Sequence, residues 1–330
     1  MGLKTYLAKR IIYTLVLVFF VLTLNFIIFE LLPGQASTIE AITGKGSRVS
    51  QAQIQAIENQ YGLNQPLYVR YYKYMYNVLS LQFGISLRTQ HSVLQDLISF
   101  LPNTLVLLGA STILAVVIGI GLGMLSAYKR GGALDTSSVV ASLTTFSLPT
   151  FWMGLLAILI FSYTLNILPS GGNEPAFWAY NPPHNLLTIV STQIQYAILP
   201  VAVLTLFQYG FYVLLTRATM LETLNEDYIT TARAKGVSER NVLVKHAFKN
   251  ASLPLVTSVA LAFGGILGGA IITETVFRWP GLGFWTFLSI QFRDTPVLQT
   301  IFYLGAMGII IANFVADILY GLIDPRIKYG

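Results

Sequence analysis

The sequence predicts an all-α integral membrane protein with six transmembrane helices and a polar external module after the first span. Hydrophobic residues make up 54% of the 330 residues and charged residues only 10%, which is too apolar for a soluble protein of this length. The apolar residues fall into long runs, each able to cross a bilayer as a helix. Lys and Arg gather in alternate polar segments, as expected for a chain that crosses a membrane repeatedly.

The first apolar run, Ile11–Leu32, has 22 residues, or about 33 Å as a helix, and follows a basic start at 1–10. A cleaved signal peptide is the alternative. The run is longer than the usual signal core, however, and no small-residue cleavage site follows it. We therefore expect a retained span. Five more spans are expected, at about Thr104–Tyr128, Ser138–Leu168, Ile194–Thr216, Leu255–Phe277 and Thr300–Leu322.

The segment between the first two spans is mostly polar. Ser50–Tyr61 has the pattern of a capped amphipathic helix, which Gly62 would end. Leu67–Leu81 is rich in tyrosine, whose rings favour the membrane interface. We expect residues 1–102 to form the first span and an external module, and residues 103–330 to form a five-helix core that Pro102 introduces.

Glycine and proline mark two features inside the spans. Gly119, Gly121 and Gly123 have the wrong spacing for a phosphate loop and lie in an apolar run, which indicates close helix packing. Four glycines of the fifth run form overlapping small-xxx-small pairs, with the same implication: Gly264, Gly265, Gly268 and Gly269. Pro149 would bend the third span, either to shape a pathway or only as a packing kink.

The distribution of basic residues predicts the topology. The segments expected inside hold 3, 2, 6 and 2 Lys or Arg residues, against 5, 0 and 2 in the outside segments. Both termini are therefore expected in the cytoplasm. Nucleic-acid binding is the other possible reason for a net charge of +6, but the topology explains it better.

Groups for catalysis or metal binding are scarce. The chain has no cysteine, no glycine-lysine phosphate loop, and three histidines far apart in sequence. Glu30, Arg217, Glu222 and Glu274 are expected close to span ends, where a charge can reach water. Asp317 is expected about a turn and a half inside the sixth span, paired with a basic neighbour or part of a proton path. No cofactor is expected in this chain.

Another long polar interruption between apolar runs is 226–254. Asp227 can begin a short helix, Ala232 to Lys235 favour helix, and Gly236 suits the left-handed residue after a helix end. Ser238 can then cap a second helix, with Glu239 in its first turn. The pattern predicts a helix–Gly–helix elbow on the membrane surface, either docked on a partner or simply interfacial.

Several motifs resemble those of ABC-importer permeases of the peptide/nickel branch. Residues 228–236, followed by Leu253-Pro254, are similar to the cytoplasmic coupling loop of that family. The general pattern has Glu-Ala-Ala, three further residues and then Gly; here the first two positions are Thr230 and Thr231, and Ala232 and Gly236 match. Other segments also resemble the family: Leu148–Gly154, Glu274–Gly283 and Asp324–Arg326. Tyr61–Pro66 and Phe83–Ser86 are similar to the external module of the first-type subunit of the pair.

The resemblance implies an importer-type ABC permease fold in the cell membrane, with a coupling loop at 217–253. It implies a second, similar permease subunit, two ATPase subunits that carry ATP and Mg²⁺, and an extracytoplasmic solute-binding protein. It also implies the residues that contact the ATPase: Glu226, Asp227, Tyr228, Thr231, Ala232, Arg233, Ala234, Lys235, Gly236 and Val237. Within that set, Asp227, Arg233 and Lys235 would make rim contacts, and Tyr228, Ala232 and Val237 buried ones. Aromatic residues near the third span would line a pathway together with Pro149: Phe151, Trp152 and Tyr163.

The expected cargo is an oligopeptide or dipeptide, carried inward by alternating access. Oligosaccharides and nickel complexes are the alternatives within the same machinery. A secondary transporter would need buried ion-coupling residues and often inverted repeats, and neither is visible. A membrane scaffold without transport activity also remains open. No nucleic-acid partner is expected, and lipid surrounds the spans.

Overall fold

The computed structural model describes residues 3–31, 55 and 64–323, and these are almost entirely helical. Within this part of the chain, Ile85 and Ser92 form an isolated antiparallel bridge. We use α for α-helices and η for short segments with tighter or wider turns. In chain order the elements are α1 (Leu3–Phe26), η1 (Ile27–Leu31), α4 (Leu67–Leu79), α5 (Val93–Tyr128), α6 (Ala133–Ser147), α7 (Thr150–Ala157), η2 (Ile158–Thr164), η3 (Ala176–Ala179), α8 (Leu186–Leu224), α9 (Asp227–Ala234), α10 (Glu239–Asn241), η4 (Val242–Ala247), α11 (Phe248–Ala251), α12 (Leu253–Gly265), η5 (Ile266–Gly268), α13 (Ile271–Val276), α14 (Leu282–Gln291) and α15 (Thr295–Ile323).

Four helical stretches are long and apolar enough to cross a membrane: Ala8–Leu31, Val93–Tyr128, Leu186–Leu224 and Thr295–Leu319. Two bent helix pairs are also long and apolar enough to cross a membrane when each pair is taken together. This gives up to six crossings if each pair is one span. The membrane-protein prediction is therefore confirmed. The count of six depends on how the bent pairs lie in the bilayer.

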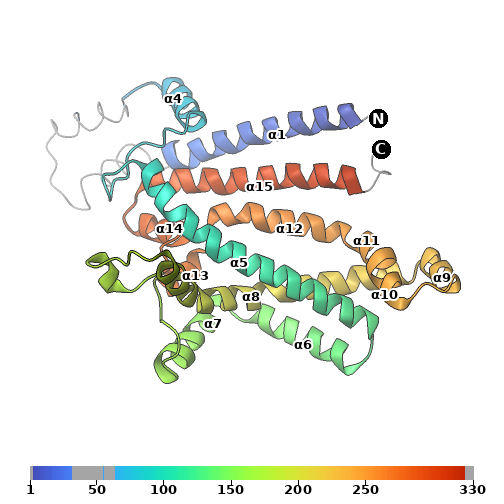
Figure 1. The fold of residues 1–330 in the computed structure, drawn as a ribbon. Helices are drawn as coiled ribbons and strands as arrows, with labels where there is room; N and C mark the ends of the chain where they lie inside the picture. Colours follow the sequence, from blue (N-terminus) through green and yellow to red (C-terminus); the bar gives the residue numbers. More distant parts are fainter. Residues whose placement is uncertain (1–2, 32–54, 56–63, 324–330) are drawn as a thin grey trace.

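The long helices run roughly side by side (Figure 1), with α5 against α8, α12 against α15, and α1 against α15. Small residues allow the closest approaches, because a Cβ at Gly119 or Gly123 would collide with α8. Gly264 of α12 likewise packs on Gly308 and Ala312 of α15. Gly121 and Gly265 face open space, so only part of each predicted glycine pattern makes a helix contact.

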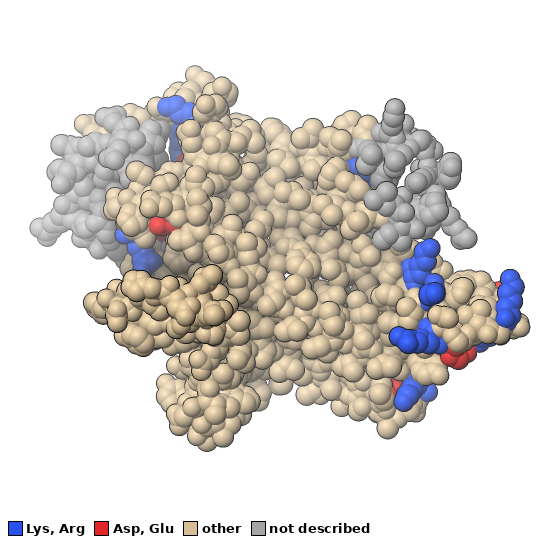
Figure 2. All heavy atoms as spheres, viewed as in Figure 1, with Lys and Arg blue, Asp and Glu red and all other residues tan. Residues whose placement is uncertain are grey.

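The two ends of the bundle differ. One end carries the start of α1, the end of α15, and the α9–α11 segment (Figure 1). The other end carries α4, α13 and α14. On the face shown in Figure 2, Lys and Arg lie at these two ends, and the region between them shows no charged residues, as expected for a belt facing lipid.

The third predicted span is two helices rather than one. α6 and the α7–η2 segment meet at an angle of 97°, far beyond an ordinary proline kink. Leu148 is extended, with ψ 135°, because a residue that precedes proline is pushed out of the helical region. Pro149 then precedes the first residue of α7. The predicted proline bend is confirmed, but the continuous span from Ser138 to Leu168 is not.

The fifth predicted span ends earlier than expected. Its helix stops at Gly268, and Gly269 takes a left-handed conformation with φ +73° that permits a close backbone contact with Gly283. Ile271–Val276 then form the separate short helix α13. The expectation that Glu274 lies at a span end and reaches water is wrong, because this side chain is completely buried.

The second and fourth spans are longer than predicted. α5 begins at Val93, so Pro102 lies inside the helix rather than at its start. Leu97 and Leu101, which precede this proline, pack in the cluster around Trp285, and this packing offsets the missing hydrogen bond. α8 begins at Leu186, eight residues before the predicted start of the fourth span at Ile194. The predicted helix at Ser50–Tyr61, Gly62, and the motif at Asp324–Arg326 lie outside the described residues.

Candidate functional site

The elbow predicted from Gly236 is present, and its bend has a specific hydrogen-bond pattern. The Gly236 amide donates to the Arg233 carbonyl at 2.9 Å, and the Val237 amide donates to the Ala232 carbonyl at 3.2 Å. This pair of bonds is a Schellman motif, which satisfies the last carbonyls of a helix and needs a left-handed residue after its end. Gly236 provides it, with φ +77°.

The helix after the bend begins where the sequence predicts. Ser238 is its N-cap residue, but the side chain makes no capping hydrogen bond. The segment then passes through the wider turns of η4 into α11. The position of the start is confirmed, and the proposed side-chain cap is not formed.

The inner side of the elbow packs on the membrane helices of its own chain. Ile229 and Ala232 of α9 are buried in a cluster with Met220 of α8 and Val242 of η4. Val237 packs against the same cluster. Ala232 therefore faces this chain and not the outer surface. Burial of this side makes α9 move with the end of α8 and with the segment that leads into α12.

The outer side of α9 is polar and exposed. Glu226 and Asp227 stand at its start and Arg233 in its last turn, the arrangement that favours a helix dipole. Arg233 forms an ion pair with Glu239 across the bend, with Nε–Oε1 at 3.0 Å. The remaining predicted contact residues that are exposed on this side are Tyr228, Thr231, Ala234, Lys235 and Gly236.

One side-chain hydrogen bond fixes the elbow from outside its core, and a hollow lies beside it. Asn250 of α11 donates from Nδ2 to the Tyr228 hydroxyl at 2.7 Å. A hollow of about 290 Å³ lies between the end of α5 and the α10–η4 segment, lined by residues such as Tyr128, Arg240 and Val244. Both features lie at the bundle end that carries the start of α1 and the end of α15 (Figure 1).

A buried ion pair lies beneath the elbow and was not predicted from the sequence. Arg217 of α8 donates to both carboxylate oxygens of Asp135 on α6. Asp135 also accepts from the Ser126 hydroxyl and the Gly131 amide, each at 2.9 Å. The carboxylate thus joins α5, α6 and α8. An acidic residue shortly after Lys129-Arg130 is the only sequence signal that points to it.

Two more buried carboxylates organise the opposite end. Glu274 accepts from the amides of Ala270 and Phe284, both at 3.0 Å, and from the Thr104 hydroxyl at 3.2 Å. It thereby joins α5, α13 and α14. Asp294 accepts from Ser86 and from the amides of Leu87 and Arg88. These three carboxylates are positioning groups, which sequence reasoning missed because their partners are distant along the chain.

The predicted pathway aromatics do not converge on a site within this chain. Phe151, Trp152 and Tyr163 lie on the bent α7–η2 arm and are all exposed. Asp317, in contrast, has a clear partner: Arg10 of α1 lies 2.9 Å from its carboxylate. Among the described residues, no group of three or more His, Asp or Glu side chains is placed to hold a metal ion.

This fold, a bundle of membrane-spanning helices with a polar elbow at one end, defines a multi-pass membrane protein. The chain belongs to the family described as the binding-protein-dependent transport system inner membrane component, whose model matches residues 119–329. The N-terminal model of the same transport systems matches residues 3–108. It is therefore a membrane permease component of a binding-protein-dependent importer.

Named relatives match over almost the whole chain. The oligopeptide transport system permease protein AppB of Bacillus subtilis is 35% identical over 99% of this chain and 100% of its own length. The probable D,D-dipeptide transport system permease protein DdpB of Escherichia coli is 39% identical over 94% of this chain and 93% of its own. The di/tripeptide transport system permease protein DppB of Pseudomonas aeruginosa is 36% identical over 98% and 99%.

Proposed function

We propose that this chain moves short peptides inward as one permease subunit of an ATP-driven importer, and that the elbow receives the motion of an ATPase partner. The peptide cargo rests on the printed names of the three relatives, which are transport permeases for oligopeptides, dipeptides and tripeptides. The coupling role rests on the geometry of α9.

The observation that carries the coupling role is the two-sided character of α9. Its inner side is buried against α8 and η4, while its outer side presents charged and polar groups. A helix held in this way cannot shift without moving the membrane helices to which it is packed. A partner that grips the outer side can therefore drive the bundle, in the helix-in-groove mode.

The contact surface follows from exposure. We assign Glu226, Asp227, Tyr228, Thr231, Arg233, Ala234, Lys235 and Gly236 to the ATPase interface, because they lie on the outer side. Ala232 supports the interface from within, since it is buried in this chain's own cluster. Val237 is partly buried there and forms the edge of the interface.

The proposed topology places the elbow and both termini in the cytoplasm. The start of α1 and the end of α15 lie at the same bundle end as α9 (Figure 1), which supports this arrangement. Residues 1–102 then act as first span and external module, and 103–330 as the permease core. A second, similar permease subunit, two ATPases and an external solute-binding protein complete the proposed assembly.

The bent α7–η2 arm is the proposed pathway wall. Pro149 sets its direction, and its exposed aromatic side chains, at Phe151, Trp152 and Tyr163, would meet the second permease subunit or the cargo. Aromatic surfaces suit peptides and oligosaccharides alike, so these residues do not select between cargoes. Competition between short peptides and oligosaccharides for the purified solute-binding protein identifies the cargo.

Cross-linking tests the elbow directly, because the natural chain has no cysteine and a single introduced one is unique. A photoreactive label on Ala234→Cys should join this chain to an ATPase subunit in the assembled transporter. The same label on Val244→Cys, exposed on the η4 segment, is the control for proximity in general. If the label at 234 reacts only with lipid or solvent, the coupling proposal fails. Uptake that continues without ATP but stops when an ion gradient collapses would instead identify a secondary transporter.

A further inference from the structure

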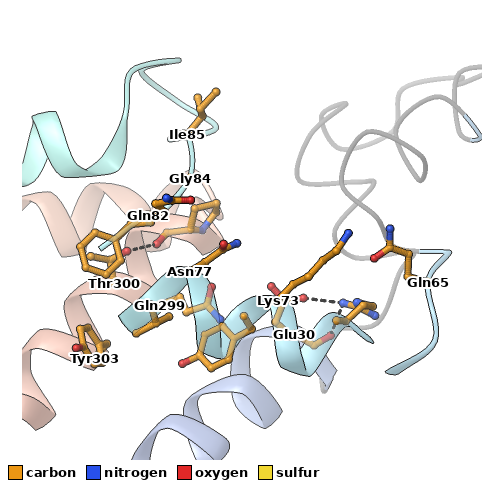
Figure 3. A pocket seen from close by; sticks show the side chains of 15 residues that line it. Glu30, Gln65, Lys73, Asn77, Gln82, Gly84, Ile85, Gln299, Thr300 and Tyr303 are labelled. Carbon is orange, nitrogen blue, oxygen red and sulfur yellow. Dashed lines mark hydrogen bonds and ion pairs between the residues drawn. The ribbon is translucent and has the colours of Figure 1, made fainter. Parts of the chain in front are cut away.

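A polar hollow of about 370 Å³ lies at the bundle end opposite the elbow, between α4, the end of η1 and the start of α15. Figure 3 shows Lys73 and Asn77 of α4 and Gln299, Thr300 and Tyr303 of α15 around this space. Its volume falls in the range of small-molecule sites. Nothing in the elbow or in the buried carboxylate networks described above uses it.

Three polar atoms of residues that line this hollow are buried without a hydrogen-bond partner among the described residues: the Tyr74 hydroxyl, Gln299 Nε2 and Gln65 Oε1. The Tyr74 side chain is only 7% exposed. Buried polar groups are nearly always satisfied, so an unpaired hydroxyl that lines a hollow indicates something that binds there. Burial and the nearby Glu30 carboxylate raise the pKa of Tyr74, so its hydroxyl stays protonated and can donate.

Positively charged side chains outnumber negatively charged ones around the hollow. Arg70 is already paired with Glu30, its Nη2 lying 2.6 Å from Oε2. Lys73 has no ion-pair partner among the residues that the structure describes. The lining therefore carries one uncompensated positive charge, together with several amide donors. An anionic group with at least two acceptor atoms complements this set, and a carboxylate is such a group.

The floor of the hollow is rigid. Tyr74 and Val78 of α4 are buried in a cluster with Phe26 of α1 and Tyr303 of α15. The Phe26 and Tyr74 rings lie 5.4 Å apart between centroids. The Tyr74 ring is thus held in place by apolar packing, and its hydroxyl is preorganised to meet a ligand.

We propose that this hollow is a binding site for a small carboxylate-bearing solute, with the Tyr74 hydroxyl, Gln299 Nε2 and the Lys73 ammonium as donors to the carboxylate. The solute is either the carboxylate end of a short peptide or a free small acid. This site lies at the opposite bundle end from the elbow. A test of the site is therefore independent of the proposed ATPase interface.

Calorimetric titration of the full chain in lipid nanodiscs tests the site, with alanyl-alanine, its C-terminal amide and acetate as probes. The free dipeptide or acetate should bind saturably, and the amide should bind about tenfold more weakly than the free dipeptide, because it lacks the charge. Dipeptide binding much tighter than acetate identifies a peptide as the source of the carboxylate. Equal affinities for the dipeptide and acetate identify a free small acid as the source of the carboxylate.

Matched variants locate the binding. Tyr74→Phe removes a hydroxyl that has no partner among the described residues, so it should keep the fold and weaken carboxylate binding about tenfold. Tyr76→Phe, on the exposed side of the same helix, should leave the affinity unchanged. Lys73→Gln should also weaken binding. No saturable binding of either carboxylate, or affinity unaltered by both Tyr74→Phe and Lys73→Gln, would overturn the proposal and leave the hydroxyl to bound water.

Discussion

Arg217 holds Asp135 by two parallel hydrogen bonds, Nε to Oδ1 at 2.6 Å and Nη2 to Oδ2 at 2.9 Å. This bidentate pair joins α8 to the first turn of α6. Along α8, Arg217 lies about two turns before the elbow begins. The Asp135 side chain is only 5% exposed and that of Arg217 is 28% exposed, so the carboxylate is shielded from water and its loss would leave the partly exposed Arg217 without its partner.

Asp135→Asn should therefore lower stability by about 3 kcal/mol, the usual effect of removing one partner from a buried pair. Thermal unfolding of the purified protein in detergent measures it. Glu222→Gln, which changes an exposed carboxylate on the same α8, should shift the midpoint very little. Equal shifts for the two variants would show that the pair does not stabilise the bundle.

Gly236 offers a test of the elbow through backbone conformation alone. A Cβ at this position would meet no atom within 4 Å, so a substitution acts through φ +77° and not through a clash. Gly236→Val should strain the bend by about 1–2 kcal/mol or more, whereas Gly236→Asn should be tolerated.

In the proposed transporter, Gly236→Val should lower peptide uptake per ATP hydrolysed by about fivefold or more, while the chain still inserts. Uptake and ATP hydrolysis are measured together in proteoliposomes. Normal coupling in the Val variant, at normal expression, contradicts a role for the bend.

Gly264 and Gly265 are adjacent in α12 but differ in packing. Comparing the stability of their alanine variants distinguishes the effect of helix packing from that of helix propensity. A Cβ at Gly264 would lie 2.5 Å from Ala312 Cβ and 2.6 Å from the Gly308 carbonyl oxygen, whereas one at Gly265 meets open space. Gly264→Ala should lower stability by about 1–3 kcal/mol, and Gly265→Ala should not. Thermal midpoints of the two variants decide this. If Gly264→Ala is as stable as the natural chain, α12 and α15 do not pack this closely.

Asp294 anchors the segment that leads from α4 into α5. Its carboxylate accepts from the amides of Leu87 and Arg88 at 3.1 and 3.2 Å. Asp294→Ala should speed hydrogen exchange at these amides by about tenfold, since each loses its acceptor. Gln291→Ala, an exposed change nearby on α14, is the control. Unchanged exchange in the Asp294 variant would mean that other contacts hold the segment.

Much of the architecture could be predicted from the sequence because apolar runs and helix stops are local signals. The runs at 11–32 and 300–322 correspond closely to the first and last spans. Gly236 marks the bend where it occurs, since a left-handed helix end favours glycine regardless of its surroundings.

The remaining features depend on contacts between distant segments. The sequence predicts that Ala232 contacts a partner, yet the cluster around Met220 buries it. Gly269 ends the fifth span early because Gly283, fourteen residues on, packs against it. The partners of Asp135, Glu274 and Asp294 are set by helix packing, which a single sequence does not display.

The uninterrupted course of α8 has a mechanical consequence. Its 39 residues extend about 58 Å, nearly twice the thickness of the hydrocarbon layer. A tilt of about 5° at one end would carry the other end sideways by about 5 Å, enough to admit or exclude a side chain. One rod can therefore convert a small push on one face of the membrane into a gate on the other.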